Sequence, residues 1–532
     1  MMRKFITYLV VLTLFVCFRV SAQQSKKIKS TIPERTISLD FNNAKGKLNK
    51  MFNHCVGAGR ANEGLRSDWQ QQLAEVRKEC GFRYIRMHGL LTDDMAVYKE
   101  DNNGNPIYNY MYIDALFDYL QSIGIKPFVE LGFMPSQLAS GPQTIFWWRG
   151  NVSPPKDYKK WGGLITNLVQ HFTERYGAEE VKTWYFECWN EPNLSPGFWT
   201  GSQQDYFKLY KYTANAVKGV NQTYRVGGPA TAGAAWVPET IAYCKENNVP
   251  IDFISTHSYG VNQGFLDEYG NTGTVLSDNP MSVSGDVLQS RKQIKDSSMP
   301  GLELHYTEWS ASYTPSDPIH DSYHEASYVL QKLKQSGEAT NSMSYWVFTD
   351  IFEEAGPRFE PFHGGFGMVT IQGIKKPVFY AYQFLNRLGD IELANQDSAS
   401  WASKNASGNI QILAWDFTHT LPADSINNQQ FYIHDLPSKP KGELKVNIKN
   451  APEGKYTLEV YKVGYRSNDA YSSYLSMGKP AQLNRQQVEQ IKNQNNGSPV
   501  LTVTVTIKND GVFAKNLKLR ENDVYFINLV KL

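Results

Sequence analysis

Short apolar segments alternate with amphipathic segments from about residue 49 to residue 388. Apolar runs bounded by turn residues predict strands, and segments with one apolar face predict helices. The predicted strands cover residues 53–57, 84–88, 127–132, 184–190, 225–228, 253–257, 302–308 and 343–348. The helices predicted between and after them cover residues 67–80, 112–123, 158–176, 203–220, 238–247, 323–335 and 379–388.

This alternation predicts an α/β fold of the (β/α)8 TIM-barrel type, because eight successive strand–helix units suit a closed parallel barrel. The alternative is a doubly wound open sheet, which usually has a glycine-rich phosphate-binding turn after its first strand. Gly57 and Gly59 lie at that position, but Arg60 and Ala61 follow and the third glycine is missing. The barrel is therefore favoured.

The pattern changes after Leu388. Alternating or β-branched segments separated by Gly, Pro and Asn predict a C-terminal all-β, sandwich-like domain. Its predicted strands cover residues 409–417, 444–449, 455–462, 500–508 and 523–530, and residues 36–41 have the same character and can add a strand. We expect an N-terminal segment at 23–48, a catalytic barrel at 49–388 and an accessory β-sandwich at 389–532.

The first residues have the order of a secretory signal peptide. Arg3 and Lys4 precede an apolar run at residues 5–18, and small residues end at Ala22. The run is shorter than the ~20 residues of a membrane span, although an uncleaved anchor is the alternative. We expect a signal peptide at 1–22, cleavage near Ala22, and a mature protein exported to the periplasm or cell exterior without membrane attachment.

Composition narrows the function further. Fifty-four basic and 52 acidic residues give a net charge of +2, which argues against a nucleic-acid-binding protein, because such proteins need a clustered basic excess. Aromatic residues make up 13% of the chain, enough for a core and for rings that line a sugar-binding cleft. Of five cysteines, the four that follow the predicted signal peptide are widely spaced and predict buried free thiols: Cys55, Cys80, Cys188 and Cys244.

Two acids end predicted barrel strands. Catalytic side chains of a barrel project from the C-terminal ends of its strands, where Glu191 follows the fourth strand and Glu308 ends the seventh. Burying a glutamate between aromatic residues costs several kcal/mol unless a partner or a function compensates. Two carboxylates from facing strand ends can lie ~5 Å apart, the spacing of retaining glycoside hydrolysis.

Other residues at these ends have competing interpretations. Glu187 and Glu303 lie earlier on the same strands and can be structural partners, and Glu130 is a weaker catalytic candidate. Trp147 and Trp148 can stack on a sugar ring, cover the barrel top or contact another subunit. We expect no metal and no cofactor, because a carboxylate can meet the charge at C1 and no His-x-x-x-His spacing indicates zinc.

Several segments resemble one enzyme family. Residues 184–194, Trp-Tyr-Phe-Glu-Cys-Trp-Asn-Glu-Pro-Asn-Leu, resemble the acid/base signature of glycoside hydrolase family 39. Further similar blocks lie at residues 56–61, 84–91, 151–158, 348–354 and 362–367, and the likeness runs from about Met51 to Leu388. Asn-Glu-Pro alone is shared by many barrel glycosidases, whereas the set of blocks is far more specific. The blocks are more similar to bacterial β-xylosidases than to animal α-L-iduronidases.

The resemblance implies roles for individual residues. Glu191 would be the acid/base, Glu308 the nucleophile, and Asn190 a hydrogen-bond partner of the sugar 2-hydroxyl. Two histidines would hold sugar hydroxyls, two tyrosines would orient the nucleophile, and one of two adjacent acids would bind hydroxyls at the far side of the ring: His88, His257, Tyr259, Tyr313, and Glu353 or Glu354. One departure is Trp309-Ser310, where β-xylosidases tend to have Tyr-Asn, and we expect it to reshape the wall around the sugar.

The resulting expectation is an exported, retaining, exo-acting glycoside hydrolase that releases terminal β-D-xylose from xylo-oligosaccharides or related glycans. Xylose is preferred on the resemblance alone. The alternatives are an α-L-iduronidase-like or arabinopyranosidase activity, or a non-catalytic carbohydrate-binding protein. A protease or esterase ranks last, since no Gly-x-Ser-x-Gly motif is present. The expected partner is an oligosaccharide, with homo-oligomerisation left open.

Overall fold

The computed structural model describes residues 34–266, 272–419, 421 and 428–532. The predicted signal peptide and most of the predicted N-terminal segment lie outside these residues. In the part of the chain that is described, no helix is both long and apolar enough to cross a bilayer.

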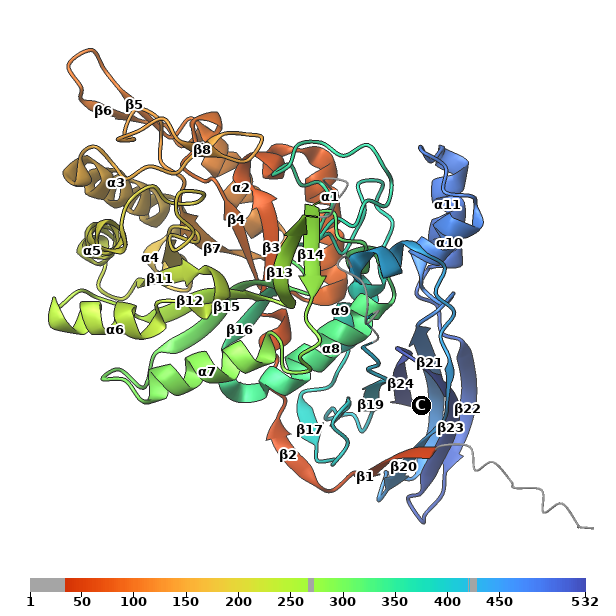
Figure 1. Cartoon of the computed structure of the whole chain (residues 1–532). Coiled ribbons are helices and arrows are strands. Elements are labelled where there is room, and N and C mark those ends of the chain that lie inside the picture. Colours follow the sequence, from red (N-terminus) through yellow and green to blue (C-terminus); the bar gives the residue numbers. More distant parts are fainter. Residues whose placement is uncertain (1–33, 267–271, 420, 422–427) are drawn as a thin grey trace, which may run out of the picture.

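Eight parallel strands close into a barrel, which confirms the predicted TIM-barrel fold (Figure 1). In barrel order they are β3 (Cys55–Arg60), β4 (Tyr84–His88), β7 (Lys126–Leu131), β10 (Tyr185–Cys188), β11 (Arg225–Thr231), β12 (Phe253–Tyr259), β15 (Glu303–Ser310) and β16 (Ser342–Tyr345). β16 pairs with β3 through Tyr345 and Val56 and closes the ring. All eight predicted strands therefore belong to the barrel.

Helices surround the barrel: α1 (Ser67–Cys80), α2 (Met111–Ser122), α3 (Tyr158–Tyr176), α4 (Ala178–Val181), α5 (Gln203–Val220), α6 (Val237–Glu246), α7 (Ser284–Lys295), α8 (His324–Ser336) and α9 (Pro377–Asn386). Local signals fix their starts: Asp157 caps α3, and Ser202 and Asp205 form a capping box on α5. The sequence pattern missed α7, because Val287 and Ile294 are the only apolar side chains that this helix buries.

Shorter elements occupy the connections. The additional hairpins pair β5 (Tyr98–Glu100) with β6 (Pro106–Tyr108), β8 (Thr144–Ile145) with β9 (Gly150–Asn151), and β13 (Val261–Leu266) with β14 (Thr272–Leu276). The 3-10 helices are η1 (Met51–Asn53), η2 (Ala61–Leu65), η3 (Asp93–Met95), η4 (Ala232–Ala234), η5 (Pro318–Asp321), η6 (Gly337–Ala339) and η7 (Asn428–Ile433).

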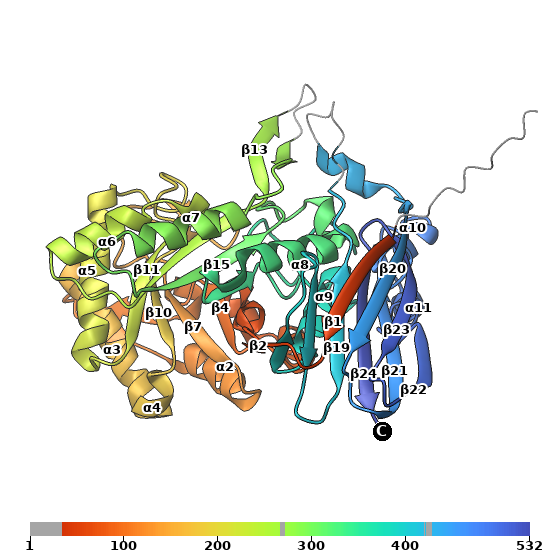
Figure 2. The ribbon, with the colours of Figure 1, turned by 90° about the horizontal axis from the view of Figure 1, so that it is seen from below.

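Two sheets form the predicted C-terminal β-region. The larger has the order β2 (Ala44–Lys47), β17 (Ile391–Leu393), β18 (Ser400–Lys404), β19 (Ile410–Trp415), β24 (Val524–Lys531), β21 (Gly454–Val463) and β22 (Leu501–Ile507). The smaller contains β1 (Glu34–Asp40), β20 (Pro440–Lys449) and β23 (Phe513–Arg520). β1 runs parallel to β20, and Figure 2 shows the two side by side. Chain that precedes the barrel thus supplies a strand to each sheet.

The C-terminal region is not all-β as expected. Helices α10 (Ala470–Ser476) and α11 (Arg485–Gln494) lie between β21 and β22. The apolar pattern of the sequence does not mark α11, because Ile491 is the one residue that this helix buries. A capping box of Asn484 and Gln487 starts the helix instead.

Alternation along the strands buries both faces of the larger sheet. On β24, Phe526 packs toward the barrel while Tyr525 and Ile527 pack against the smaller sheet. Phe384 of α9 stacks on Phe526, with ring centroids 5.4 Å apart, and Trp415 Nε1 donates to Gln331 Oε1 of α8 at 3.0 Å. The β-region and the barrel therefore share one apolar interface.

A second connection reaches the barrel mouth. Asn428 of η7 exchanges two hydrogen bonds with the backbone of Leu276 in β14, at 2.9 and 3.0 Å. Gln429 Nε2 lies 3.2 Å from Asp317 Oδ2, in the loop after β15. The C-terminal region thus holds the hairpin of β13 and β14 from behind.

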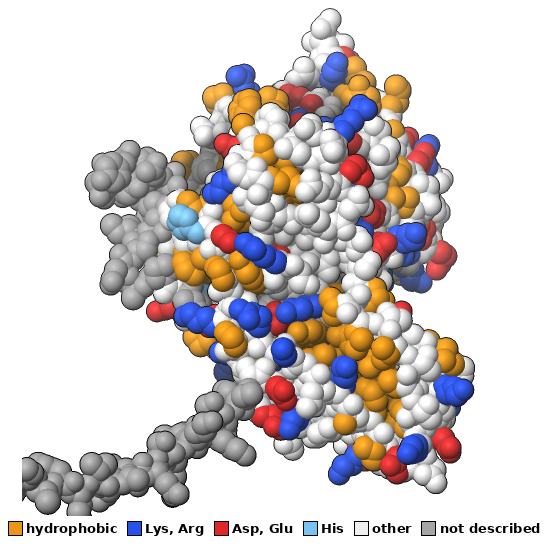
Figure 3. All heavy atoms as spheres, turned by 90° about the vertical axis from the view of Figure 1, so that its right-hand side faces the viewer, with side chains coloured by type: hydrophobic (Ala, Val, Ile, Leu, Met, Phe, Trp, Pro, Cys, Tyr) orange, Lys and Arg blue, Asp and Glu red, His pale blue; other side chains and the backbone are white. Residues whose placement is uncertain are grey.

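The outer face of the C-terminal region carries exposed apolar side chains (Figure 3). β22 forms the edge of the larger sheet, and the side chain of Val503 on this strand is 40% exposed. An apolar edge strand is a template for pairing with another chain. Homo-oligomerisation stays open.

We expect Phe384→Ala to lower the free energy of unfolding by about 3–5 kcal/mol, because it opens a cavity at the shared interface. Thermal and urea unfolding of the full chain measure this effect. Met111→Ala is the matched control, since the Met111 side chain is 68% exposed and its removal should change stability by at most about 0.5 kcal/mol. Equal effects of both substitutions would contradict the interface.

Candidate active site

A cavity of about 820 Å³ opens at the C-terminal ends of the barrel strands. Most of the predicted site residues line it: His88, Asn190, Glu191, Tyr259, Glu308, Tyr313 and Glu354. His257 is fully buried and contacts Glu191 from behind. Of the predicted site residues, His257 and Glu353 do not line the cavity.

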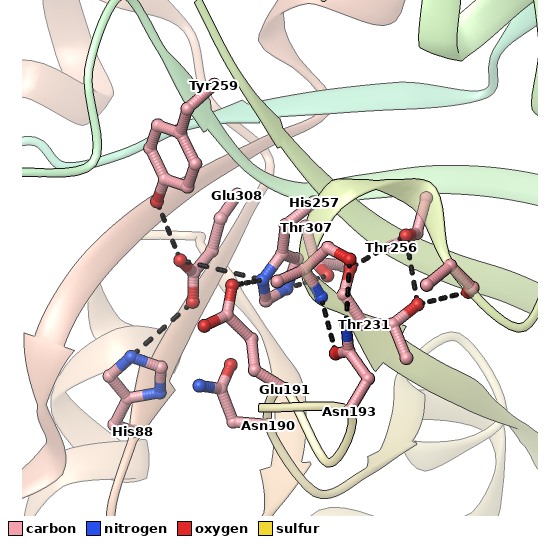
Figure 4. Close-up of polar contacts among 12 residues, drawn as sticks. His88, Asn190, Glu191, Asn193, Thr231, Thr256, His257, Tyr259, Thr307 and Glu308 are labelled. Atoms are coloured by element: carbon pink, nitrogen blue, oxygen red, sulfur yellow. Dashed lines mark hydrogen bonds and ion pairs between the residues drawn. The ribbon is translucent and has the colours of Figure 1, made fainter. Parts of the chain in front are cut away.

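The two predicted catalytic acids face each other (Figure 4). Glu308 comes from β15, and Glu191 lies just after β10 in a left-handed conformation with φ 46°, an unfavourable region for a non-glycine residue. A hydrogen bond of 2.8 Å from Glu191 N to Ala230 O holds this turn. Carboxylate oxygens of Glu191 and Glu308 lie within 4.8 Å of each other. That separation suits a retaining pair, because inverting enzymes place their acids ≈ 6.5–9.5 Å apart.

Arg86 of β4 lies fully buried beneath this pair. Its guanidinium donates to Glu187 Oε2 and Asn190 Oδ1, each at 2.8 Å, and contacts Glu308 Oε1. It also lies 2.8 Å from Glu130 Oε2. Burial lowers the pKa of a guanidinium, but the three carboxylates outweigh that effect and raise the pKa of Arg86. Arg86 is therefore a fixed positive charge at the floor of the site.

Glu308 is held at both oxygens. Oε1 faces Arg86 and lies 3.4 Å from His88 Nε2, while Oε2 accepts a 2.7 Å hydrogen bond from the Tyr259 hydroxyl. Burial raises the pKa of Glu308, and its neighbours His257, Arg86 and His88 oppose that shift. These contacts favour the ionised carboxylate that a nucleophile needs.

Glu191 has a different environment. Burial raises its pKa to about 7, and its Oε1 lies 2.8 Å from His257 Nδ1. Burial also lowers the pKa of His257 to about 4, so this neighbour is neutral at pH 7. The two carboxylates thus have different surroundings, which suit Glu191 to carry a proton and Glu308 to lose one.

His88 is charged where His257 is neutral. Burial alone would lower its pKa, but Glu130 at 2.7 Å, together with Glu354 and Glu308, raises the pKa to about 10.

The site also contains three possible metal ligands. One oxygen each of Glu191 and Glu308 and one nitrogen of His257 lie within 4.8 Å of one another, a spacing that metal sites share. Arg86 and His88 already supply positive charge beside Glu308, which disfavours a cation there. That no metal or cofactor is needed stays a prediction.

The adjacent acids Glu353 and Glu354 point in different directions. Glu354 lines the cavity, with Oε1 3.4 Å from His88 Nε2. Glu353 instead pairs with Arg60 at 2.7 Å and with Arg66 at 3.4 Å. Of the two, the cavity presents Glu354 to a ligand.

Tyrosine and tryptophan rings complete the walls. Tyr313 lies at the rim, 47% exposed, with its ring edge-to-face against Tyr259 at 6.1 Å between centroids. The hydroxyl that contacts Glu308 is that of Tyr259. Trp346, which sequence analysis did not single out, lines the cavity against Gly57. A Cβ on Gly57 would lie 2.3 Å from Trp346 Cε3, so the glycine makes room for the indole.

The expectation for Trp309 is wrong. Glu308 points into the cavity while Trp309, which follows a register irregularity between Tyr306 and Trp309, packs outside the barrel against Tyr345. The cavity wall contains neither Trp309 nor the tandem tryptophans. Trp147 is 57% exposed and Trp148 packs on Phe146, and it is Phe146 that lines the cavity.

Sequence analysis also missed Arg86 and Thr307. Arg86 lies two residues before His88 on β4, so both side chains share the inner face of the barrel. The period of two was therefore a signal that could have identified Arg86. Thr307 carries no comparable signal, because a hydroxyl beside a strand-end acid is common in barrels of any function.

A parallel barrel with two facing carboxylates at the ends of its fourth and seventh strands is the architecture of a retaining glycoside hydrolase. The profile of Glycosyl hydrolases family 39 matches residues 35–514. The chain therefore belongs to this family, which confirms the resemblance found in the sequence, and it is a glycoside hydrolase.

Individual relatives agree. A β-xylosidase of Caldicellulosiruptor saccharolyticus is 39% identical over 463 residues, which is 86% of this chain and 90% of the relative. The crystal structure of a family 39 enzyme from Xanthomonas axonopodis pv. citri is 43% identical, with a TM-score of 0.91, and the match covers 94% of this chain and 98% of that one. A monomeric β-xylosidase from Caulobacter crescentus CB15 is also 43% identical, with a TM-score of 0.90 and coverage of 94% and 100%.

We expect kcat/KM for a glycoside with a poor leaving group to fall as pH rises through about 7, because Glu191 must be protonated to act and loses its proton there. A pH–rate profile measures this limb. Glu191→Gln should remove the limb from the remaining activity on an activated aryl glycoside. If the limb is unchanged in Glu191→Gln, a group other than Glu191 causes it.

Proposed function

We propose that this enzyme is a retaining, exo-acting β-xylosidase that removes terminal β-D-xylose from xylo-oligosaccharides or related glycans. The observation that carries the proposal is the pair Glu191 and Glu308, close enough for double displacement, with a cation beside Glu308 and a pKa of Glu191 raised to about 7. Xylose as the donor sugar is supported by the β-xylosidases among the relatives, whose full lengths the chain nearly covers.

The reaction proceeds in two displacements. Glu308 attacks C1 and forms a glycosyl ester while Glu191 gives its proton to the departing glycosidic oxygen. Glu191, now a carboxylate, then takes a proton from water, whose oxygen attacks C1 and releases Glu308. The sugar leaves with the configuration it had in the substrate.

Neighbouring groups bind the sugar. Asn190 Oδ1 is occupied by Arg86, which leaves its amide hydrogens for the sugar 2-hydroxyl, a contact that strengthens as C1 gains positive charge. His88 and Glu354 present a donor and an acceptor to the other ring hydroxyls on the opposite side of the cavity.

The lining of the cavity favours a neutral sugar over a uronic acid. An α-L-iduronidase-like activity needs a cationic side chain facing the C5 carboxylate. The described residues that line the cavity include no Lys or Arg, and their one cation, His88, is already surrounded by Glu130, Glu354 and Glu308. The acids Glu354 and Asp286 also line the cavity. Repulsion from these acids disfavours a negatively charged donor.

We expect Glu191→Ala to lose about 10²–10⁴-fold in kcat/KM on xylobiose, the usual contribution of a general acid. It should lose much less on nitrophenyl β-D-xyloside in the first displacement, because that leaving group needs no proton. Glu308→Ala should lose both activities, and proton NMR should show β-xylose as the first product. Equal losses of Glu191→Ala on both substrates would contradict the acid role. Preference for an arabinopyranoside or an iduronide over the xyloside would contradict the donor.

We also infer that the mature enzyme is exported, which rests on the charged, apolar and small-residue order of residues 1–22. N-terminal sequencing of the protein recovered outside the cytoplasm should begin near Gln23. Recovery of intact chains that begin at Met1 in the membrane fraction would support an uncleaved anchor instead.

A further inference from the structure

A chain of hydrogen bonds runs from the acid Glu191 into the barrel interior. His257 Nδ1 lies 2.8 Å from Glu191 Oε1, and His257 Nε2 lies 3.1 Å from Thr307 Oγ1. Thr307 Oγ1 donates to Glu187 Oε1 at 2.8 Å. All four side chains are buried, and Figure 4 shows His257 between Glu191 and Thr307. The far end of the chain is an acid to which the reaction assigns no role.

The direction of the chain is determined from that far end. Arg86 Nε donates to Glu187 Oε2 at 2.8 Å. Burial raises the pKa of Glu187, but Arg86, His257 and the hydrogen bonds from Ser255 and Thr307 together keep the pKa below its ordinary value. An ionised carboxylate only accepts hydrogen bonds, and a threonine hydroxyl has a single hydrogen to give. Thr307 therefore gives its hydrogen to Glu187 and can only accept from His257.

The rest of the chain follows from this direction. If Thr307 accepts, the proton of the neutral His257 ring is on Nε2, and Nδ1 carries a lone pair. A lone pair cannot donate to Glu191, so the contact at 2.8 Å requires Glu191 to be the donor. The geometry is thus satisfied only when Glu191 is protonated.

We propose that Glu187 and Thr307 are positioning residues that fix the His257 tautomer and thereby keep the proton on Glu191 between turnovers. The role rests on the proposed function of Glu191 as acid. After the first displacement, the Glu191 carboxylate faces the His257 lone pair, an unfavourable contact. This contact favours transfer of a proton from the attacking water to Glu191, which restores the resting state.

Other charged groups surround Glu191 and His257. They are Arg86 and His88 on β4, Glu130 on β7, Glu308 on β15 with Oε2 3.7 Å from His257 Nδ1, and Glu354 after β16. The cations favour loss of the Glu191 proton and the acids oppose it. Because these groups remain in place when Thr307 or Glu187 is changed, the effect of the tautomer can be measured separately.

We expect Thr307→Val, which removes the hydroxyl at nearly constant shape, to free His257 to place its proton on Nδ1. His257 then donates to the Glu191 carboxylate, which lowers the pKa of Glu191. The basic limb of kcat/KM on xylobiose should move to lower pH by about one unit, with about a tenfold loss on that limb. Glu187→Gln should act in the same direction, because its amide nitrogen would donate to Thr307 and reverse the chain.

Two control variants test whether the shift in the pH profile comes from the hydrogen-bond chain. Thr307→Ser keeps the hydroxyl and should keep the wild-type pH profile. Thr256→Val removes a neighbouring buried hydroxyl that bonds to Thr231 O at 2.8 Å, outside the chain, and should also leave the profile unchanged. A shift in Thr256→Val equal to that in Thr307→Val would show general disturbance of the barrel and overturn the proposal.

A measurement without turnover separates this proposal from the proposed function. Nitrogen-15 NMR of histidine-labelled full-length enzyme should report a proton on Nε2 of His257 in the wild type, and on Nδ1 in Thr307→Val. A wild-type proton on Nδ1 would overturn the proposal, even if Thr307→Val fails to fold. If the enzyme shows the expected tautomers but does not cleave xylosides, the result supports the role of Thr307 and Glu187 in fixing the His257 tautomer. The same result contradicts only the proposed β-xylosidase function.

Discussion

The active site depends on one buried cation. The Arg86 guanidinium contacts side chains from strands β7, β10 and β15 and from the turn after β10, namely Glu130, Glu187, Glu308 and Asn190. An unpaired charge in a barrel interior costs several kcal/mol, and here the catalytic machinery itself compensates for it. The closed barrel consequently fixes the position of Glu308, while the turn after β10, held by the hydrogen bond from Glu191 N to Ala230 O, fixes that of Glu191.

The same interior separates residues of one type into different charge states. His88 lies among carboxylates and is cationic, whereas His257 lies between Glu191 and a hydroxyl and is neutral. Glu308 touches a cation and a phenol, whereas Glu191 touches a neutral ring. Proton donor and nucleophile can therefore coexist within 4.8 Å without either acid being forced into the other's state.

Much of this was predictable from the sequence, because period and position along a strand determine which side chains enter a barrel. The strand ends gave Glu191 and Glu308, and family motifs gave their supporting residues. Loop conformation was not predictable: only the turn after β16 decides that Glu354 faces the cavity and Glu353 faces Arg60. Helix α7 was missed because few apolar side chains mark it. Trp309 was misplaced because its position on the outer face of β15 was not considered.

The contact of η7 with β14 has a consequence for how this enzyme can evolve. Asn428 and Gln429 belong to the C-terminal region, yet they bond to Leu276 and Thr274 of a hairpin whose residues Val261 and Asn262 form part of the cavity wall. Recombination between homologous genes at the barrel boundary would combine the hairpin of β13 and β14 from one gene with η7 from another, although the two were not selected together. Mutations in η7 can thus change which aglycones enter the cavity, although among the described residues η7 contacts none of the groups that bind the sugar ring.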